Sequence, residues 1–166
     1  KSIDKYDTYS AKIEYTHVFT PMSKLNFGVE YYHMTSVSDF YYANYQDQNY
    51  VNDPQKSNLF GFDEDYVAGF ITYNRVWSPK FITVLGARGE YVYDKGVQKI
   101  TGEKISRHEF APLPMLVLMY NIHPEHQLSY TFASRMLRIP FNYYNPFRYY
   151  VSPTIYKENN PELKTP

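Results

Sequence analysis

YSAKIEYTHVFTPMSKLNFGVEYY is the sequence of residues 9–32, where polar and apolar side chains alternate on either side of one short break. A period of two is the period of a β-strand. The break, residues 21–24, contains proline and serine, which favour turns. We therefore predict a β-hairpin with two apolar rows, which are Tyr9, Ala11, Ile13 and Tyr15, then Leu25, Phe27, Val29 and Tyr31.

The same pattern occurs twice more along the chain. Strands predicted at about residues 66–76 and 81–93 flank a turn at 77–80, and strands at about 109–120 and 127–138 flank a turn at 121–126. Pro112 and Pro114 lack the N–H that a ladder uses, so we expect the fifth strand to pair only from Leu116 onward. The sequence thus predicts an all-β chain, an antiparallel up-and-down meander of about six long strands in three hairpins.

The connections between these strands alternate in length. Three short turns alternate with long polar segments at residues 41–65, 94–106 and from 139 to the end. Outer-membrane barrels have short periplasmic turns and long extracellular loops, whereas a soluble Greek-key sandwich has no reason for this asymmetry. Strands of about 11–14 residues also exceed the usual globular length of about 5–6 and suffice to cross a membrane. We therefore predict part of a transmembrane β-barrel in the cell outer membrane.

The composition excludes several classes of protein. With 17 basic and 17 acidic residues, the chain offers no charge reason to expect a nucleic-acid partner. Without cysteine it has no disulfides and no thiol chemistry. No nucleophile–base pair and no convergent ligand set is visible, so we expect no enzyme, no metal site and no cofactor. The 20 tyrosines suit surfaces that are half apolar and half wet, such as membrane interfaces.

Charged and aromatic side chains inside the strands refine this prediction. We expect the charges to face the wet lumen of a barrel and to pair across strands, although a solvated face of a soluble sheet has the same period. These charges are Lys12, Glu14, Glu30, Arg75, Arg88, Glu90 and Arg135. We also expect two aromatic girdles, one of Phe19, Trp77, Phe81 and Tyr120 beside the short turns, and one of Tyr41, Tyr42, Tyr91 and Tyr93 beside the long loops.

The tail carries a family resemblance. Arg138-Ile139-Pro140 is followed by NPFRYY at residues 145–150 and by NPELK at 160–164. Together with LGARGEY at residues 85–91, these segments resemble the TonB-dependent receptor superfamily of outer-membrane proteins. The match departs at Thr165-Pro166, where that family usually has Pro-Glu, and its Gly-Leu-Arg-x-Glu-Tyr pattern is shifted here by one residue.

The resemblance implies a larger parent with about 22 strands, an N-terminal plug domain and an energy-coupling partner at the inner membrane. Strand counting agrees, because single-chain outer-membrane barrels have at least eight strands and an open sheet would leave two bare edges. We therefore interpret residues 1–166 as a partial barrel domain of three hairpins, with the plug and the remaining strands outside it, and a protomer that closes a barrel by association is the alternative.

These expectations combine into a function. We expect a segment of a receptor that imports a nutrient across the outer membrane, with outer-membrane lipid, the rest of the barrel, the plug, an energy-coupling protein and a surface lipoprotein as partners. Candidate ligand contacts in the third long loop are Asn142, Tyr143, Tyr144, Arg148, Tyr149 and Tyr150, because tyrosine rings stack on sugars and arginine binds anionic groups. The alternatives are a soluble carbohydrate-binding β-sandwich and a non-transporting outer-membrane scaffold barrel.

Overall fold

The structure is a computed structural model that describes residues 2–46, 48–53, 55–100, 102–137, 143, 148–150, 152 and 155–160. One six-stranded antiparallel sheet dominates it, in the order β1-β2-β5-β6-β7-β8. Its strands are β1 (Ser2–Thr20), β2 (Ser23–Phe40), β5 (Asn58–Ser78), β6 (Phe81–Gln98), β7 (Lys104–His123) and β8 (His126–Ala133). Two small hairpins complete it, formed by β3 (Ala43–Gln46) with β4 (Asn49–Asn52) and by β9 (Tyr149–Tyr150) with β10 (Tyr156–Lys157). The described part of the chain contains no helix long and apolar enough to cross a membrane.

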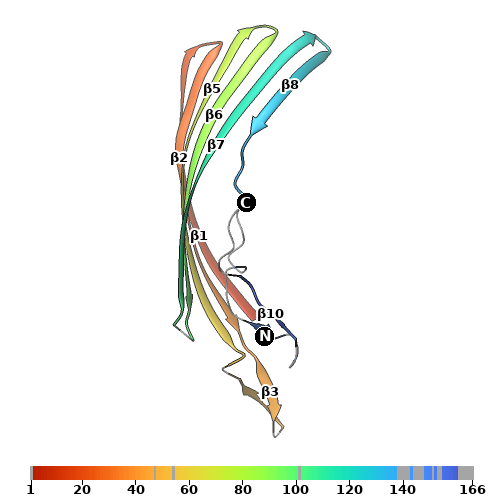
Figure 1. The fold of residues 1–166 in the computed structure, drawn as a ribbon. Coiled ribbons are helices and arrows are strands. Elements are labelled where there is room, and N and C mark those ends of the chain that lie inside the picture. Colours follow the sequence, from red (N-terminus) through yellow and green to blue (C-terminus); the bar gives the residue numbers. More distant parts are fainter. Residues whose placement is uncertain are drawn as a thin grey trace.

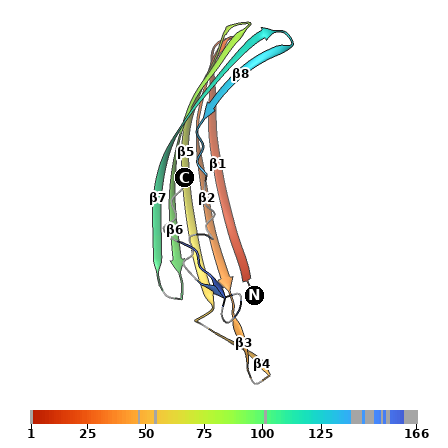
Figure 2. The same cartoon turned by 45° about the vertical axis from the view of Figure 1, so that its right-hand side comes forward.

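The large sheet is long, narrow and curved like a section of a tube wall (Figures 1 and 2). The tight turns β1–β2, β5–β6 and β7–β8 lie together at one end, and the β3–β4 hairpin projects from the other end (Figure 1). Residues 134–137, which follow β8, lie on the concave side of the sheet (Figures 1 and 2). The predicted meander of about six long strands is thus confirmed.

Strand register assigns each side chain to one face of the sheet, because residues directly opposite in an antiparallel pair point the same way. Glu30 lies opposite Ala68, which lies opposite Glu90, and all three are on the concave face. Val29 lies opposite Gly69 and Gly89 on the convex face. The even-numbered residues of β1, β2, β5 and β6 therefore face inward, and the odd-numbered ones face outward.

The concave face holds the buried hydrophobic side chains of the residues that the structure describes. Tyr66, Ala68 and Val92 are at most 3% exposed, and Met136, which follows β8, packs against them together with Tyr32. Phe60 and Phe62 are buried on the same face, nearer the β3–β4 end. A single sheet buries one face only where other chain covers it, so the segment after β8 supplies part of this cover.

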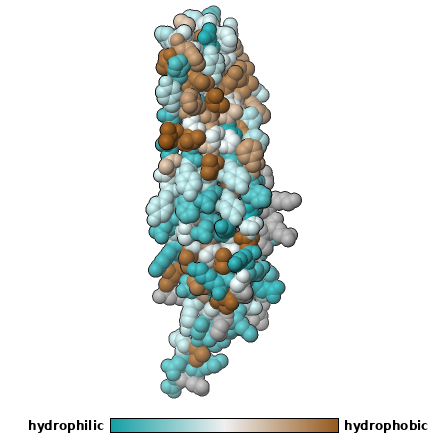
Figure 3. Space-filling view, turned by 90° about the vertical axis from the view of Figure 1, so that its left-hand side faces the viewer, coloured by the Kyte–Doolittle hydropathy of each residue, from teal (hydrophilic) through white to brown (hydrophobic). Residues whose placement is uncertain are grey.

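The convex face is apolar in a band nearest the tight turns and polar beyond it (Figure 3). Exposed outward residues of this band include Ile13, Phe27, Val29, Val67, Ile71, Leu85, Phe110 and Phe132. The band ends at a polar cluster, where the Tyr31 hydroxyl donates to Asp65 Oδ1 at 2.8 Å and His33 Nδ1 lies 2.9 Å from the same oxygen. A soluble protein would rarely expose so large an apolar patch.

The strands are longer than their hydrophobic alternation predicted. β1, β2, β5, β6 and β7 span 18–21 residues each, because hydrogen bonding continues where the regular alternation of polar and apolar side chains is lost. The long connection expected at residues 94–106 is therefore wrong, since β6 and β7 leave only residues 99–103 between them. The connection expected at 41–65 also contains the β3–β4 hairpin and the start of β5.

Pro112 and Pro114 lie inside β7, so the expectation that pairing begins at Leu116 was wrong. Pro112 lies opposite Gly89 and Pro114 opposite Ala87 in the β6 ladder. The Pro114 carbonyl accepts from Ser134 N, on the β8 side, so the missing N–H of Pro114 also points to that side. β8 ends at Ala133, and the prolines thus occupy an edge where no ladder donor is needed.

The aromatic side chains expected beside the tight turns all share the outward parity. At that end of the sheet, β1 carries Phe19, β5 carries Trp77, β6 carries Phe81 and β7 carries Tyr120. Trp77 Nε1 donates to the Thr83 hydroxyl at 3.0 Å. At the other end of the band, Tyr91 and Tyr93 face outward from β6, whereas Tyr41 and Tyr42 lie beyond the end of β2. The first girdle is thus complete as predicted and the second only in part.

Candidate functional site: the concave wall and its loops

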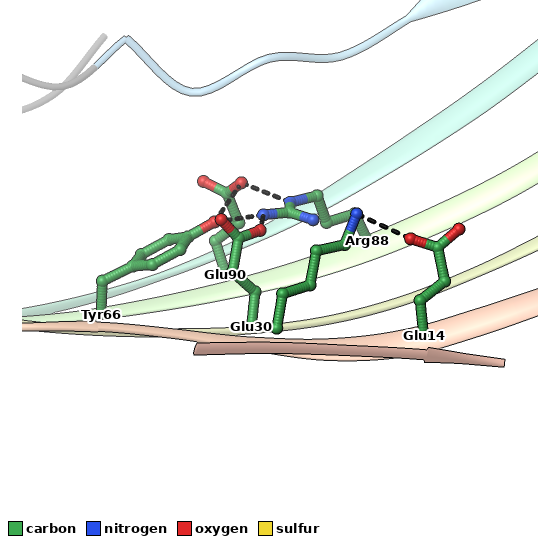
Figure 4. A network of polar contacts seen from close by, with 6 residues as sticks. Glu14, Glu30, Tyr66, Arg88 and Glu90 are labelled. Atoms are coloured by element: carbon green, nitrogen blue, oxygen red, sulfur yellow. Dashed lines mark hydrogen bonds and ion pairs between the residues drawn. The ribbon is translucent and has the colours of Figure 1, made fainter. Parts of the chain in front are cut away.

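Arg88 is at the centre of a polar network on the concave face (Figure 4). Its Nη2 lies 2.7 Å from Glu30 Oε2 on β2, and its Nε lies 2.6 Å from Glu90 Oε1 on β6. The same guanidinium donates to the Tyr66 hydroxyl on β5, which in turn donates to Glu90 at 2.8 Å. One arginine thus joins three neighbouring strands, with its side chain only 29% exposed.

A second ion pair extends this wall toward β1. Lys12 Nζ lies 2.7 Å from Glu14 Oε2, and Asn26 donates to the other Glu14 oxygen at 2.6 Å. The Lys12 ammonium is 5.1 Å from the centroid of the Phe70 ring, and the Arg88 guanidinium is 5.7 Å from the same centroid. Phe70 therefore lies between two cations, which a ring face attracts.

A third pair, which the sequence did not single out, lies on β6 and β7. Arg107 Nη2 is 3.3 Å from Asp94 Oδ2 and 3.5 Å from Glu109 Oε2. Two arginines, Arg88 and Arg107, thus face four carboxylates, Glu30, Glu90, Asp94 and Glu109, which leaves two negative charges in excess. The signal that could have found Arg107 was its position opposite Asp94, which requires knowing the register.

The strand register does not place two of the predicted lumen charges on the concave face. Arg135 is beyond the end of β8 and is exposed, so no strand fixes its direction. Arg75 has the outward parity on β5, and its guanidinium lies 5.2 Å from the Trp77 ring centroid near the tight turns. Lys12, Glu14, Glu30, Arg88 and Glu90 all lie on the concave face.

At the β3–β4 end, aromatic rings and cations from two loops meet. Tyr42, which follows β2, has its ring 6.4 Å from that of Tyr150 in β9. Lys56 Nζ lies 5.2 Å from the Tyr42 centroid and 5.4 Å from that of Tyr150. The Tyr156 ring is 5.9 Å from the Tyr150 ring, and Arg148 lies 4.9 Å from the Tyr156 centroid. We call these five residues the loop cluster.

Both cations of the loop cluster have carboxylate partners. Lys56 Nζ is 3.8 Å from Asp53 Oδ2, and Arg148 Nε is 3.2 Å from Glu158 Oε2. The hydrogen bond to Glu158 raises the pKa of Arg148 above its ordinary value. The loop cluster is therefore close to neutral and rich in aromatic faces, a combination suited to stacking.

Of the predicted loop contacts, the structure brings Arg148 and Tyr150 together in the loop cluster. Tyr143 is exposed and lies near Lys157, whose ammonium is 5.8 Å from the Tyr143 ring centroid. Tyr149 is in β9, and Asn142 and Tyr144 lie outside the described residues. Sequence reasoning missed Tyr42, Lys56 and Tyr156, because only the fold places them beside Tyr150.

A family model described as the outer membrane protein beta-barrel family matches residues 1–165. The chain belongs to this family. It is an outer-membrane β-barrel protein, so its concave face is the barrel lumen and its convex apolar band faces lipid. The β-sandwich alternative does not fit this membership or the single large sheet.

A solved structure has the same fold. The crystal structure of the ferric citrate transporter FecA in the unliganded form matches with a TM-score of 0.61 and 19% sequence identity, over 77% of this chain. The chain spans only 20% of the FecA chain, so it corresponds to a part of the FecA barrel. No curated protein matches the sequence.

Proposed function

We propose that this chain is part of the wall of a TonB-dependent receptor that imports a nutrient across the outer membrane. In this proposal a plug domain fills the lumen, and an energy-coupling protein and a surface lipoprotein act with it. The observation that supports it best is the Arg88 network, which offers paired, half-buried charges on the lumen side of a lipid-facing wall. A barrel that only anchors other proteins would have no need of such an ordered lumen face.

The charges of the lumen wall and the tyrosines of the loop cluster also support a proposal about the class of ligand that is imported. Because the carboxylates of the lumen wall exceed its arginines, a neutral or cationic solute meets less repulsion there than an anionic one. The tyrosines of the loop cluster offer stacking faces at the mouth. We therefore propose that the loop cluster makes the first contact with a neutral, ring-containing ligand, with Tyr42, Tyr150 and Tyr156 as the stacking residues.

A growth competition between strains with and without the full-length protein tests this proposal. The media would be limited in turn by ferric citrate, by a neutral oligosaccharide and by other single nutrients. We expect the deletion strain to lose on a neutral nutrient, and the advantage of the intact strain to vanish when the energy-coupling protein is absent. A deletion that alters the composition of the outer membrane but impairs growth on none of these nutrients would instead establish the scaffold alternative.

A further inference from the structure

Asn58 is a buried amide on the concave face, near the β3–β4 end of the lumen. It is the first residue of β5 and is 1% exposed. It lies opposite Phe40, so its side chain shares the concave face with Phe60 and Phe62. Among the residues that the structure describes, none accepts from Asn58 Nδ2 and none donates to Asn58 Oδ1. Both halves of one buried amide are thus unpaired there.

An unpaired amide at this position lowers the stability of the free protein. A polar group that leaves water and gains no partner costs free energy. Phe60, on the same face of β5, is also 1% exposed, so an apolar side chain at position 58 would have an apolar neighbour. A residue that disagrees with its surroundings in this way is expected mainly at functional sites. The hydrogen-bonding capacity of Asn58 is therefore available to a bound molecule.

Asn58 directly follows residues that belong to the loop cluster or fix its position. The hydroxyl of Ser57, the preceding residue, accepts from Tyr42 N at 3.0 Å. Lys56, two residues before Asn58, lies 5.2 Å from the Tyr42 ring centroid and 5.4 Å from that of Tyr150. Aromatic faces for stacking and an unpaired amide therefore occur together at this end of the lumen.

The contacts that hold β9 in the loop cluster are weak. β9 and β10 have two residues each and form a separate hairpin, which alone is only marginally stable in water. The ion pair between Arg148 and Glu158, which flank this hairpin, joins side chains that are 53% and 46% exposed. Such surface pairs add little stability. A ligand ring can therefore replace Tyr150 beside Tyr42 at a small cost in free energy.

We propose that Asn58 selects the ligand of the loop cluster, an inference that rests on the proposed import function. A ring of the ligand stacks on Tyr42 in place of Tyr150. Asn58 Nδ2 then donates to one ligand hydroxyl, and Asn58 Oδ1 accepts from the neighbouring one. An amide offers a donor and an acceptor side by side, which matches two adjacent hydroxyls of a sugar. The ligand class is therefore a neutral sugar with a free vicinal diol.

The test measures sugar binding by the full-length protein in detergent micelles with isothermal titration calorimetry. The probes are neutral disaccharides, each paired with its fully O-methylated form, which keeps the rings and loses every hydroxyl donor. We expect the wild type to bind at least one free disaccharide at least tenfold more tightly than its methylated form. In Asn58→Leu, and in Asn58→Ala as a second variant, this preference should disappear, because a site that pairs with hydroxyls discriminates through its polar group.

Unfolding by urea without sugar gives a second readout. Asn58→Leu should raise the unfolding midpoint, because it removes an unpaired buried amide. Ser36→Ala is the matched control, since Ser36 is also 1% exposed and its Oγ has no partner among the described residues. Ser36 lies on the same face but four residues from Phe40 along β2, or roughly 13 Å. The control should raise the midpoint as well, yet keep the preference for the free disaccharide.

Each contrary result has a distinct meaning. An undiminished preference in Asn58→Leu would overturn the inference and leave the import proposal in place. A lowered unfolding midpoint would also overturn it, because Asn58 would then have a partner, such as a trapped water, in the free protein. So would an equal loss of preference in Ser36→Ala. A wild type that binds no free disaccharide would overturn the inference too, and the growth competition on the other nutrients would then decide the import proposal separately.

Discussion

Arg88 connects three strands of the lumen wall through one planar group. Its fork geometry allows Nε and Nη2 to serve Glu90 and Glu30 at the same time, which a lysine ammonium at one point cannot do. The surrounding carboxylates are only partly exposed, so their charges are screened less than those of a surface pair. The stability of this part of the wall therefore depends on a single side chain.

We predict that Arg88→Met lowers the free energy of unfolding by about 1–2 kcal/mol, because it leaves Glu30 and Glu90 beside each other without a cation. Unfolding of the full-length protein in detergent micelles by urea measures this. Lys12→Met is the matched control, since the Lys12 side chain is 52% exposed and its pair with Glu14 is open to water, and it should change little. Equal effects of the two substitutions would show that the Arg88 network adds nothing specific.

Gly28 and Gly69 are strand glycines with opposite surroundings. A Cβ on Gly28 would collide with the Ile13 carbonyl oxygen and would lie 2.8 Å from Phe70 Cζ, whereas one on Gly69 would have no atom within 4 Å. We predict that Gly28→Ala destabilises the barrel by about 1–3 kcal/mol through overpacking, and that Gly69→Ala does not. The same urea titration compares them, and a tolerated Gly28→Ala would contradict the close packing of Phe70 over β2.

Each strand separates lipid from lumen through alternate side chains, so adjacent residues should respond oppositely to a charge. Ile71 faces lipid within the apolar band, and Thr72 faces the lumen. We predict that Ile71→Lys costs about 2–4 kcal/mol of folding free energy in lipid vesicles, as a lysine near the bilayer midplane does. Thr72→Lys should cost much less, because its ammonium can reach lumen water. A reversed order would mean that the two faces are assigned incorrectly.

The sequence predicted the hairpins of this fold but not the full length of its strands or the contacts between distant residues. The hairpins near residues 21, 79 and 124 were predictable because alternation and turn residues coincide there. The outer parts of β5 and β7, such as Asn58 and Lys104, were not, since charged, amide and glycine residues interrupt the regular hydrophobic period there. Arg107 and Tyr42 were missed for a related reason. Their partners, Asp94 and Tyr150, become neighbours only through register and loop folding.

Among the strands that the structure describes, the sheet ends at β1 and β8 without a further pairing strand, and its convex face is widely apolar. Free edges and apolar patches both promote association in water. We predict that the 166-residue chain alone forms large β-rich assemblies in plain buffer and smaller β-rich particles in detergent. Far-UV circular dichroism with size-exclusion chromatography in both conditions tests this, and a compact monomer in plain buffer would contradict the lipid-facing assignment.

The prolines of β7 have a mechanical consequence for the wall. On its β8 side, β7 forms ladder hydrogen bonds from His123 to the Pro114 carbonyl. On the same side, Pro112 and Pro114 have ring carbons where other residues have an N–H donor. Any strand that pairs with this part of β7 would lack the backbone hydrogen bonds that Pro112 and Pro114 cannot donate. The β7–β8 ladder therefore lacks backbone hydrogen bonds at its Pro114 end. A force that pulls β8 away from β7 would separate the two strands from that end first.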